Sequence, residues 1–492
     1  MKKMNLLVMS LVSAAALSFS SCSSNDDLTS GGTLSQADGV YMTLKISGAT
    51  SHGTRTSVTD GKTTTDNGSV AESTITEGMM YIYDGPTCVF RKVITKDMFE
   101  TAPTQTTSGV TKPIKVAVTG AITTGKKYDV YFLANRTNVD NPIAATSIFT
   151  SNTGGADFAT DNNFVMFNQN DGTKAAAHSK VEFTDAAKSD KSPAAAGEIK
   201  LDRVVARIDN PSFAETAKTV DDAAAGTTKN VTKVVASFDY VGYAASNLNN
   251  NSYVKQNWDN KFETLNVKWV EGANKYFQPK DFFGTLYEGK NLGVFKQNNT
   301  YAFENTTTDV EDATAVYFQV KANLTDAAKT ASDFKDGTFY RYDGRLYTSI
   351  QAIYDDAATG AISNPFTETN SITPAQVVAM ISKDGKLTED EAKLAKFRED
   401  YKIEVYRQGV MYYRWAISDM AYKPFVASET THTYSVLRNS IYRLNVTKVN
   451  EIGKDVPNGP EPDDPIKNPN FYMNVTVSIN PWVLNTKDIE LK

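Results

Sequence analysis

Cysteine and histidine are scarce in this chain of 492 residues, which contains two cysteines and three histidines. Cys88 is the one cysteine outside the N-terminal segment, so an intramolecular disulfide has no second partner there. A nucleophilic cysteine needs a neighbouring base, yet no histidine lies in a recognisable motif; the three are His52, His178 and His432. We therefore expect packing to stabilise the fold and Cys88 to be a small structural residue.

Several other signals are also missing. The formal net charge is −6 and no cluster of lysine and arginine stands out, which argues against a nucleic-acid partner because phosphate binding needs a basic face. No glycine-rich phosphate loop, zinc-ligand spacing or nucleophile with a placed base occurs. The sequence thus predicts no metal, no cofactor and no enzyme. After residue 21 no stretch is apolar enough to cross a membrane.

What the chain does contain is β-forming sequence. Threonine, asparagine, valine and tyrosine are abundant, and short alternating segments end at Gly, Asp, Pro or Asn. The class is mostly β, and the strand spacing predicts β-sandwiches. We place a boundary near Gly197, between an N-terminal sandwich of residues 56–197 and a C-terminal sandwich of residues 198–453. Predicted strands include 79–93, 113–120, 126–135, 197–210, 232–243, 264–270, 315–324, 401–417 and 434–453.

Two small helical insertions are predicted on the C-terminal sandwich. In residues 373–385, Thr373 is the expected cap, Pro374 the first helical residue and Gly385 the terminator. In residues 387–397, Thr388 and Glu391 have the spacing of a capping box. Both helices are expected at the surface of the β scaffold.

The N-terminus predicts export. Residues 1–21 have the basic start and short apolar run of a secretory signal peptide. Cys22 follows small residues, as at bacterial lipoprotein cleavage sites, where the cysteine carries diacylglycerol and palmitate. The alternative is a plain signal peptide with an incidental cysteine. An acidic tract after Cys22 is similar to those of lipoproteins sent to the cell surface, and the Ser/Gly/Asp-rich stretch up to residue 39 is typical of a tether.

A strand stands alone near each end of the chain. Near the N-terminus, alternate residues are apolar and a soft loop containing Arg55 follows; these residues are Val40, Met42, Leu44 and Ile46. Near the C-terminus, a proline-rich spacer of residues 454–470 precedes an alternating segment, residues 471–492. Its apolar face comprises Phe471, Met473, Val475, Val477 and Ile479. A lone strand has unpaired amides and an exposed apolar row, so each must pair with a sheet edge.

These segments resemble the fimbrillins of type V pili, most closely the shaft subunit of the minor, Mfa-type fimbrium. The resemblance is carried by YMTLKISGATSHGTR near the start, LDRVVAR, VLRNSIYRLNVTKV, the spacer, and FYMNVTVSINPWVL at the end. It covers most of the chain, whereas residues 210–400 match only in general character. The resemblance implies two transthyretin-like Greek-key β-sandwiches.

The resemblance also implies a mechanism. An arginine-specific surface protease would cut between Arg55 and Thr56, removing the lipidated propeptide 22–55 with its strand from the outer membrane lipoprotein. The C-terminal strand of an identical subunit, with Trp482 as a further anchor, would then fill the groove. The implied partners are identical subunits and the tip and anchor subunits of a pilus that supports adhesion and biofilm formation.

Other interpretations remain open. Arg55 could be an ordinary exposed arginine. The alternating C-terminal segment could be the last strand of its own domain, and Trp482 could be an aromatic residue at the rim of a groove. A second functional hypothesis is a surface-anchored lipoprotein that binds a glycan or host protein without polymerising. A third is a glycan-degrading enzyme, for which paired carboxylates are required and none can be placed.

Overall fold

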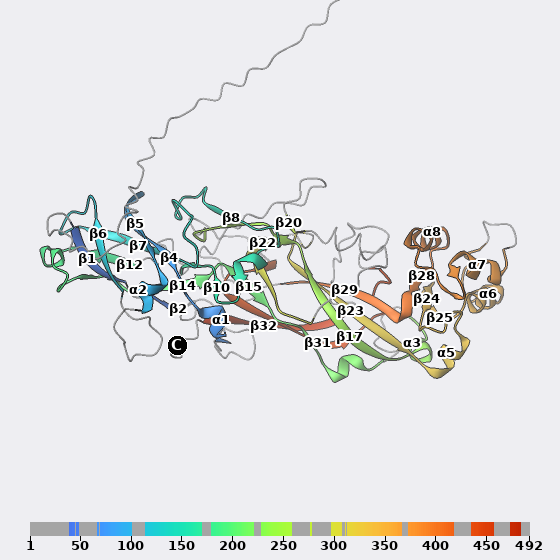
Figure 1. The fold of residues 1–492 in the computed structure, drawn as a ribbon. Helices are drawn as coiled ribbons and strands as arrows, with labels where there is room; N and C mark the ends of the chain where they lie inside the picture. Colours follow the sequence, from blue (N-terminus) through green and yellow to red (C-terminus); the bar gives the residue numbers. More distant parts are fainter. Residues whose placement is uncertain are drawn as a thin grey trace, which may run out of the picture.

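The computed structural model describes residues 39–44, 46–48, 66–67, 69–100, 114–169, 179–220, 228–257, 276–277, 297–307, 310, 312–366, 372–417, 434–456 and 473–483. Figure 1 shows an elongated molecule with β1 and β6 at one end, long strands in the middle and α6, α7 and α8 at the other end. The predicted mostly β class is confirmed. The Greek-key connectivity stays a prediction.

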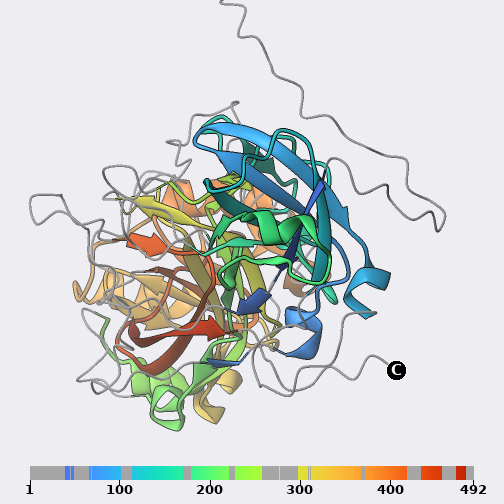
Figure 2. The ribbon, with the colours of Figure 1, turned by 90° about the vertical axis from the view of Figure 1, so that its left-hand side faces the viewer.

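The N-terminal sandwich consists of two sheets around one core. One sheet has the order β2-β14-β11-β7-β4-β5, with β12 also beside β7, and the other has the order β13-β1-β6. Buried side chains from both sheets, among them Met42, Met80 and Phe132, form a single cluster. Figure 2 shows this sandwich facing the viewer along the long axis of the molecule.

The elements of this sandwich follow the predicted alternation. The first strands are β1 (Gly39–Leu44), β2 (Ile46–Gly48), β4 (Gly78–Asp84), β5 (Thr87–Ile94), β6 (Ile114–Thr119) and β7 (Lys127–Ala134). Later strands are β8 (Ile148–Thr150), β9 (Ala159–Thr160), β10 (Asn163–Phe164), β11 (Met166–Asn168), β12 (Ser179–Glu182), β13 (Ala194–Ala195) and β14 (Ile199–Arg203). The short helices are α1 (Val70–Ser73), α2 (Lys96–Glu100), η1 (Ala156–Phe158) and η2 (Asp185–Lys188).

Several predicted strands are divided in the structure: residues 79–93 form β4 and β5, residues 401–417 include β28 and β29, and residues 434–453 include β30 and β31. In residues 197–210 the division also changes the domain. Residues 197–210 read as a single dense strand, but they form β14 and β15 (Val205–Ile208), separated at Val204. β14 pairs with β11 in the N-terminal sandwich, whereas β15 pairs with β21 and β31 in the second domain. The chain therefore passes between domains at Val204, one strand beyond the boundary placed near Gly197. The local sequence does not reveal such a change of sheet, because residues 201–206, on both sides of Val204, are all buried.

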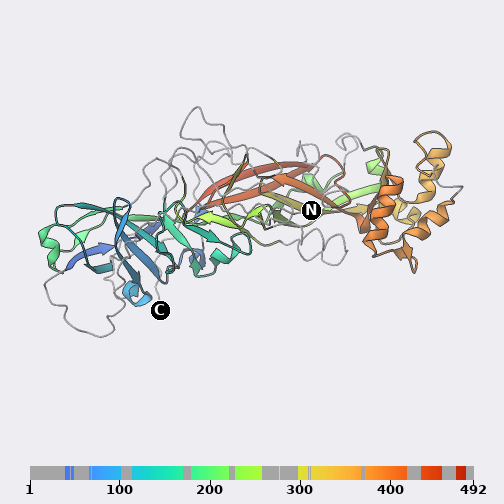
Figure 3. The same ribbon diagram turned by 90° about the horizontal axis from the view of Figure 1, so that it is seen from above.

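The second domain also has two main sheets. One has the order β21-β15-β31-β32-β3 with β16 beside β31, and the other has the order β17-β23-β29. Their facing side chains, including Phe318, Tyr413 and Leu444, form a second buried cluster. Figure 3 shows the long strands of this domain running along the middle of the molecule. The predicted strand 264–270 lies outside the described residues.

The strands of the second domain are of unequal length. They are β3 (Asp66–Asn67), β15, β16 (Ser212–Phe213), β17 (Val235–Ser246), β18 (Leu248–Asn249), β19 (Asn251–Tyr253), β20 (Tyr276–Phe277), β21 (Thr300–Phe303), β22 (Asn305–Thr307), β23 (Ala315–Leu324), β29 (Val410–Ala416), β30 (Tyr434–Val436), β31 (Ser440–Val449) and β32 (Met473–Val483). η3 (Glu215–Lys218) and α3 (Val231–Val234) connect them.

Residues 326–406, here called the helical subdomain, have a core of their own. They comprise α5 (Asp326–Ala331), β24 (Phe339–Tyr342), β25 (Arg345–Tyr347), α6 (Ile350–Ala358), α7 (Pro374–Met380), β26 (Ser382–Lys383), β27 (Lys386–Leu387), α8 (Glu391–Tyr401) and β28 (Glu404–Tyr406). Tyr340, Ile353, Leu394 and Val405 belong to a buried cluster separate from that of the sheets. The insertion is thus larger than the two surface helices expected. Within the described residues no helix has the length and hydropathy to span a membrane.

Both predicted helices form, but the end of the first and the cap of the second differ from expectation. Thr373 caps α7 and Pro374 is its first residue, as predicted, but α7 ends at Met380. Gly385, at φ +76°, instead lies in the tight turn between β26 and β27, where a positive φ is needed. The cap of α8 is Asp390, whose side chain accepts from the Lys393 N–H, so the predicted box of Thr388 and Glu391 is wrong. Thr388 accepts a hydrogen bond from Asp390 N–H one turn earlier.

Gly78 in β4 offers a test of packing in the N-terminal sandwich. A Cβ atom at this position would lie 2.3 Å from Cζ of Phe132 and 2.6 Å from the Leu133 carbonyl oxygen. We expect Gly78→Ala to lower the free energy of unfolding by about 1–3 kcal/mol, because overpacking strains the core. Urea denaturation measures this, with Gly197→Ala, whose Cβ meets nothing nearer than 3.7 Å, as the control. Equal midpoints for both variants would contradict the expected clash.

Candidate functional site

The N-terminal strand β1 occupies a central position in its sheet. It pairs antiparallel with β6 over Gly39–Leu44 and parallel with β13 at Met42 and Thr43. Val40 is 6% exposed, and Met42 and Leu44 are fully buried. Because each large apolar side chain buried contributes roughly 1.5–3 kcal/mol, β1 is an integral part of this core and not a loose leader.

The chain then crosses to the opposite sheet. Ile46, fully buried, begins β2, which pairs parallel with β14 from Ile199 to Leu201. The segment 39–48 therefore supplies strands to both sheets of the sandwich. Without it, buried residues of β6 such as Val116 would lose their cover.

The C-terminal strand β32 pairs within its own chain. It runs antiparallel to β31, with Ser440 opposite Pro481 and Val449 opposite Met473. The register sets alternate apolar residues of β32 opposite buried residues of β31: Val475 faces Val446, Val477 faces Leu444 and Ile479 faces Tyr442. The interpretation of this stretch as the last strand of its own domain describes what the structure shows.

A second strand flanks β32. Asp66 and Asn67 form β3, which pairs parallel with Trp482 and Val483. β32 thus lies between β31 and β3, and β3 follows soon after the predicted cleavage site at Arg55. The remaining predicted site residues lie outside the described part of the chain: Cys22, Arg55, Thr56 and Phe471, with the signal peptide and residues 457–470 of the spacer.

Directly after β3, the helix α1 joins the two domains. Ser69 caps α1: its hydroxyl accepts from the Glu72 N–H at 3.2 Å, and the Ser69 N–H donates to the Glu72 carboxylate at 2.7 Å. Sequence reasoning missed this site, although the Ser-x-x-Glu pattern at residues 69–72 is the signal of a capping box.

Arg203, at the end of β14, is fully buried beneath α1. Its guanidinium donates to the Glu72 carbonyl at 2.8 Å, to the Ser73 hydroxyl at 3.0 Å and to the Asn439 side chain at 3.3 Å. Burial lowers the pKa of Arg203 to about 9, with Glu72 acting in the opposite direction, so the group is still charged at neutral pH. A buried arginine bonded to both domains holds them at a set orientation.

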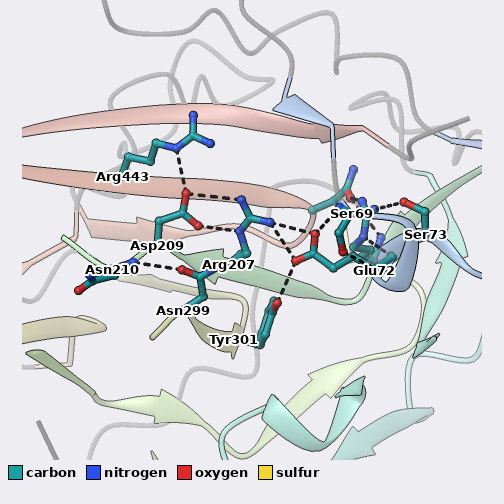
Figure 4. A network of polar contacts seen from close by, with 11 residues as sticks. Ser69, Glu72, Ser73, Arg207, Asp209, Asn210, Asn299, Tyr301 and Arg443 are labelled. Atoms are coloured by element: carbon teal, nitrogen blue, oxygen red, sulfur yellow. Dashed lines mark hydrogen bonds and ion pairs between the residues drawn. The ribbon is translucent and has the colours of Figure 1, made fainter. Parts of the chain in front are cut away.

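The Glu72 carboxylate continues this network into the second domain. Arg207 of β15 donates to it at 2.9 and 3.0 Å, and the Tyr301 hydroxyl of β21 donates at 2.8 Å. Arg207 also pairs with Asp209 at 2.6 Å, and Asp209 accepts from Arg443 at 2.9 Å. Figure 4 shows these side chains converging between α1 and the strands of the second domain.

Electrostatics favour the ionised form of Glu72. Burial by itself raises the pKa of this carboxyl, but the Ser69 N–H and the charged, bonded Arg207 outweigh it, and the pKa lies below its usual value. Arg203 and Arg207, the two arginines of LDRVVAR, thus converge on α1, which agrees with a structural role.

The motif VLRNS lies beside this network. Asn439 has φ +55°, a conformation that asparagine tolerates, and its amide donates to Asp202 at 2.7 Å. Arg438 forms a buried ion pair with Glu304 at 2.7 Å and donates to the Tyr253 carbonyl at 2.6 Å. The two motifs are far apart in sequence but meet at the domain junction.

The arrangement has the chemistry of a structural joint. Within the described residues no group of three or more His, Cys, Asp or Glu side chains is placed to hold a metal ion. Cys88 is half-buried, and its Sγ lies 3.5 Å from the Phe90 carbonyl oxygen. The candidate functional site therefore consists of two positions, here called strand seats: the place of β1 between β6 and β13, and the place of β32 between β31 and β3. The helix α1 links them.

The Glu72 network generates a pH-dependent prediction. We expect Glu72→Gln to lower the free energy of unfolding at pH 7 by about 1.5–3 kcal/mol, because hydrogen bonds to a charged group are lost. Since the folded-state pKa is lowered, this stabilisation is present above about pH 4.5 and is lost as the pH falls through the folded-state value. Urea denaturation between pH 7 and pH 3 measures the difference in the free energy of unfolding between the parent and the variant, which should decrease as the pH falls. The control Glu215→Gln, at an exposed pair with Lys218, should have little effect at any pH; a gap for Glu72→Gln that stays constant with pH would contradict the assignment.

Comparison with known proteins gives one family match. Among curated proteins none matches. A proposed cell adhesion protein of Parabacteroides distasonis is 12% identical, with 92% of this chain and 99% of that chain covered and a TM-score of 0.44. A fimbrilin of Porphyromonas gingivalis is 14% identical, with 92% and 100% covered and a TM-score of 0.40. Residues 404–488, which include β31 and β32, match the family described as "Major fimbrial subunit protein type IV, Fimbrillin, C-terminal".

Proposed function

We propose that this chain is a fimbrillin, the shaft subunit of a type V pilus of the Mfa type, and that it polymerises by strand exchange. The single observation that carries the proposal is the seat of β1, buried between β6 and β13. Loss of a central strand opens a groove with unpaired amides on both sides, and such a groove binds an added strand through its backbone. The repeating shaft position fits a chain that has both a removable strand and a donor tail.

Cleavage after Arg55 is the proposed trigger. Arg55 lies between β2, in the N-terminal sandwich, and β3, on the second domain. Arg203 is fully buried and the Arg207 side chain is 11% exposed, so neither is accessible to a protease in the folded chain. The surface protease would release the strand together with lipidated Cys22, and the removal of this competing strand makes the switch irreversible.

The proposed donor is the strand beginning at Phe471. Its five alternate apolar residues, with Trp482 beyond them, exceed the four of the segment it replaces. At roughly 1.5–3 kcal/mol for each fully buried side chain, the anchors contribute on the order of 10 kcal/mol before ordering costs. Because β32 pairs with β31 in this structure, donation requires that it first leave its own domain.

Several wider assignments belong to the same proposal. The precursor is exported as an outer membrane lipoprotein, and the mature subunit stands in a surface fimbrium. Its partners there are identical subunits together with tip and anchor subunits. The fimbrium supports adhesion and biofilm formation, and the subunit itself has no enzymatic role.

A surface-anchored binding lipoprotein is the second candidate, and one observation favours it. Both terminal strands, β1 and β32, are paired within one chain, so the uncut monomer has no vacant seat in the described residues. Mass spectrometry of the protein taken from cells separates the two functions. A lipidated species that starts at Cys22 supports the binding protein, and a species that starts at Thr56 supports the pilus subunit.

Replacement of the cleavage residue tests the trigger. We expect Arg55→Ala to leave lipid-linked monomers, because β1 stays in its seat and no groove opens. Electron microscopy of cells and gel analysis of boiled and unboiled samples measure the polymer. Arg136→Ala, at another arginine of the N-terminal half, is the matched control and should polymerise normally. Fibres of normal length from the Arg55 variant would sink the processing claim.

A reversible lock tests donor release. Asn445 and Thr476 are opposite one another in β31 and β32, a spacing that suits a disulfide. With Cys88→Ser as background, Asn445→Cys with Thr476→Cys should stop elongation of cleaved subunits under oxidising conditions and restore it with reductant. The single Asn445→Cys variant should elongate under both conditions. Elongation of the oxidised double variant would remove the assignment of β32 as donor.

A further inference from the structure

The proline-rich spacer leaves the second domain from a densely bonded segment. Residues 451–456, here called the arm root, end at Val456, one residue before Pro457. Glu451, Ile452, Asp455 and Val456 are all less than 9% exposed. Burial of a polar segment is costly unless it is hydrogen-bonded throughout, and the arm root is bonded along its length.

The arm root is attached on one side to the sheet of the second domain. Lys454 and Tyr412 of β29 exchange both backbone hydrogen bonds, at 2.8 and 3.0 Å. The Tyr413 hydroxyl donates to the Glu451 carbonyl at 2.9 Å and accepts from the Gly453 N–H at 3.0 Å. These bonds continue the edge of β29 with a short bridge.

On its other side the arm root is attached to the helical subdomain. The Asp455 carboxylate accepts from Nε of Arg398 on α8 at 2.5 Å and from the Val405 N–H of β28 at 2.8 Å. The Tyr406 hydroxyl donates to the Gly453 carbonyl at 2.8 Å, and Arg341 donates to the Ile452 carbonyl at 3.1 Å. Each residue from Glu451 to Asp455 thus has a partner outside the root.

The charges at this attachment form a chain that is largely buried at Asp455, Arg398 and Glu391. Asp455 is 3% and Arg398 12% exposed at the side chain, and Arg398 also lies 3.6 Å from Glu391, which pairs with Arg407 at 2.5 Å. Lys454 lies 3.8 Å from Glu404. When one member of a buried pair is removed, the other is left uncompensated, and the cost greatly exceeds that of breaking a surface pair.

We propose that the arm root is the mechanical anchor of the C-terminal arm, with the Asp455–Arg398 pair as the bond that transmits tension from the spacer to the helical subdomain. The inference rests on the proposed function in one respect, that the arm is under tension when it joins subunits. It assigns the helical subdomain a role, because α8 and β28 supply half of the anchor. Asp455 and Arg398 are positioning residues for the arm.

The spacer itself makes such an anchor necessary. Five prolines between residues 457 and 469 stiffen it, so it has little slack to absorb a pull. Tension at its start therefore acts directly on Asp455 and Lys454. Charge-assisted hydrogen bonds are roughly twice as strong as neutral ones, which suits them to the residue nearest the load.

Single-molecule pulling on the uncut chain tests the anchor. With Cys22→Ser and Cys88→Ser as background, handles are attached through Gly459→Cys in the spacer and Lys126→Cys on the exposed surface of the N-terminal sandwich. The first rupture in this geometry releases the arm root. Relative to the parent, Asp455→Asn should rupture at lower force, with the rate extrapolated to zero force raised roughly tenfold or more. Asp400→Asn on the same helix, at an exposed pair with Lys396, should rupture like the parent.

A second variant and a clear contrary outcome keep the test decisive. If Asp455→Asn fails to fold by circular dichroism, Arg398→Lys keeps the charge and loses the Nε donor, and it should weaken the first rupture in the same direction. Equal first-rupture forces in the parent and in the folded variant would overturn the inference. Pulling is done on monomers, so its outcome is separate from the proposed function: failure of that function would appear as absence of polymer with the difference in force unchanged.

Discussion

Backbone pairing at sheet edges is the constraint on which the rest of this structure depends. β1 gives partners to β6 and β13, β2 gives them to β14, and β32 gives them to β31. In this structure the segment β1–β2 and the strand β32 are each paired with the same number of residues on neighbouring strands. In the proposed exchange, ladder bonds alone therefore give no direction. Direction has to come from the apolar anchors and from the irreversible loss of the strand that competes.

The domain junction determines what such a loss leaves intact. Residues 66–73 follow the proposed cut and are held by the second domain, through β3 on β32 and through Glu72 on Arg207 and Tyr301. Arg203 bonds the same helix from the N-terminal side. A cut before these residues removes a strand from the N-terminal sandwich while the ion pairs between the domains remain. Where the second domain meets the helical subdomain, the arm root has a similar role for the spacer.

Much of the sandwich follows from local patterns in the sequence. Alternation with period two predicted β6, β7 and β23, whereas the predicted strand 79–93 is the β4–β5 hairpin, with Gly85 and Pro86 in the turn between the paired Asp84 and Thr87. Proline after a capping threonine predicted the start of α7. One of the predictions that failed depends on distant partners, and another on competition between neighbouring caps. Val204 separates two sheets that the local sequence does not distinguish, and Asp390 takes the cap of α8 because its side chain reaches the Lys393 N–H while Thr388 is bonded to Asp390. The role of Glu72 at the domain junction was not predicted, because the Ser-x-x-Glu pattern of a capping box is the same at the surface and at a junction.

The sequence by itself determined the strand-forming segments, their apolar faces, the stiff spacer and the class of the fold, because each depends on neighbours within a few residues along the chain. Only the tertiary structure decided which edge each strand occupies: β1 at β6, β32 at β31, and LDRVVAR against α1. The physical reason is that alternation tells which face of a strand is buried, whereas the amides and carbonyls that pair it are the same in every residue except proline. The choice of partner is made by the shape and charge of surfaces brought together from distant parts of the chain.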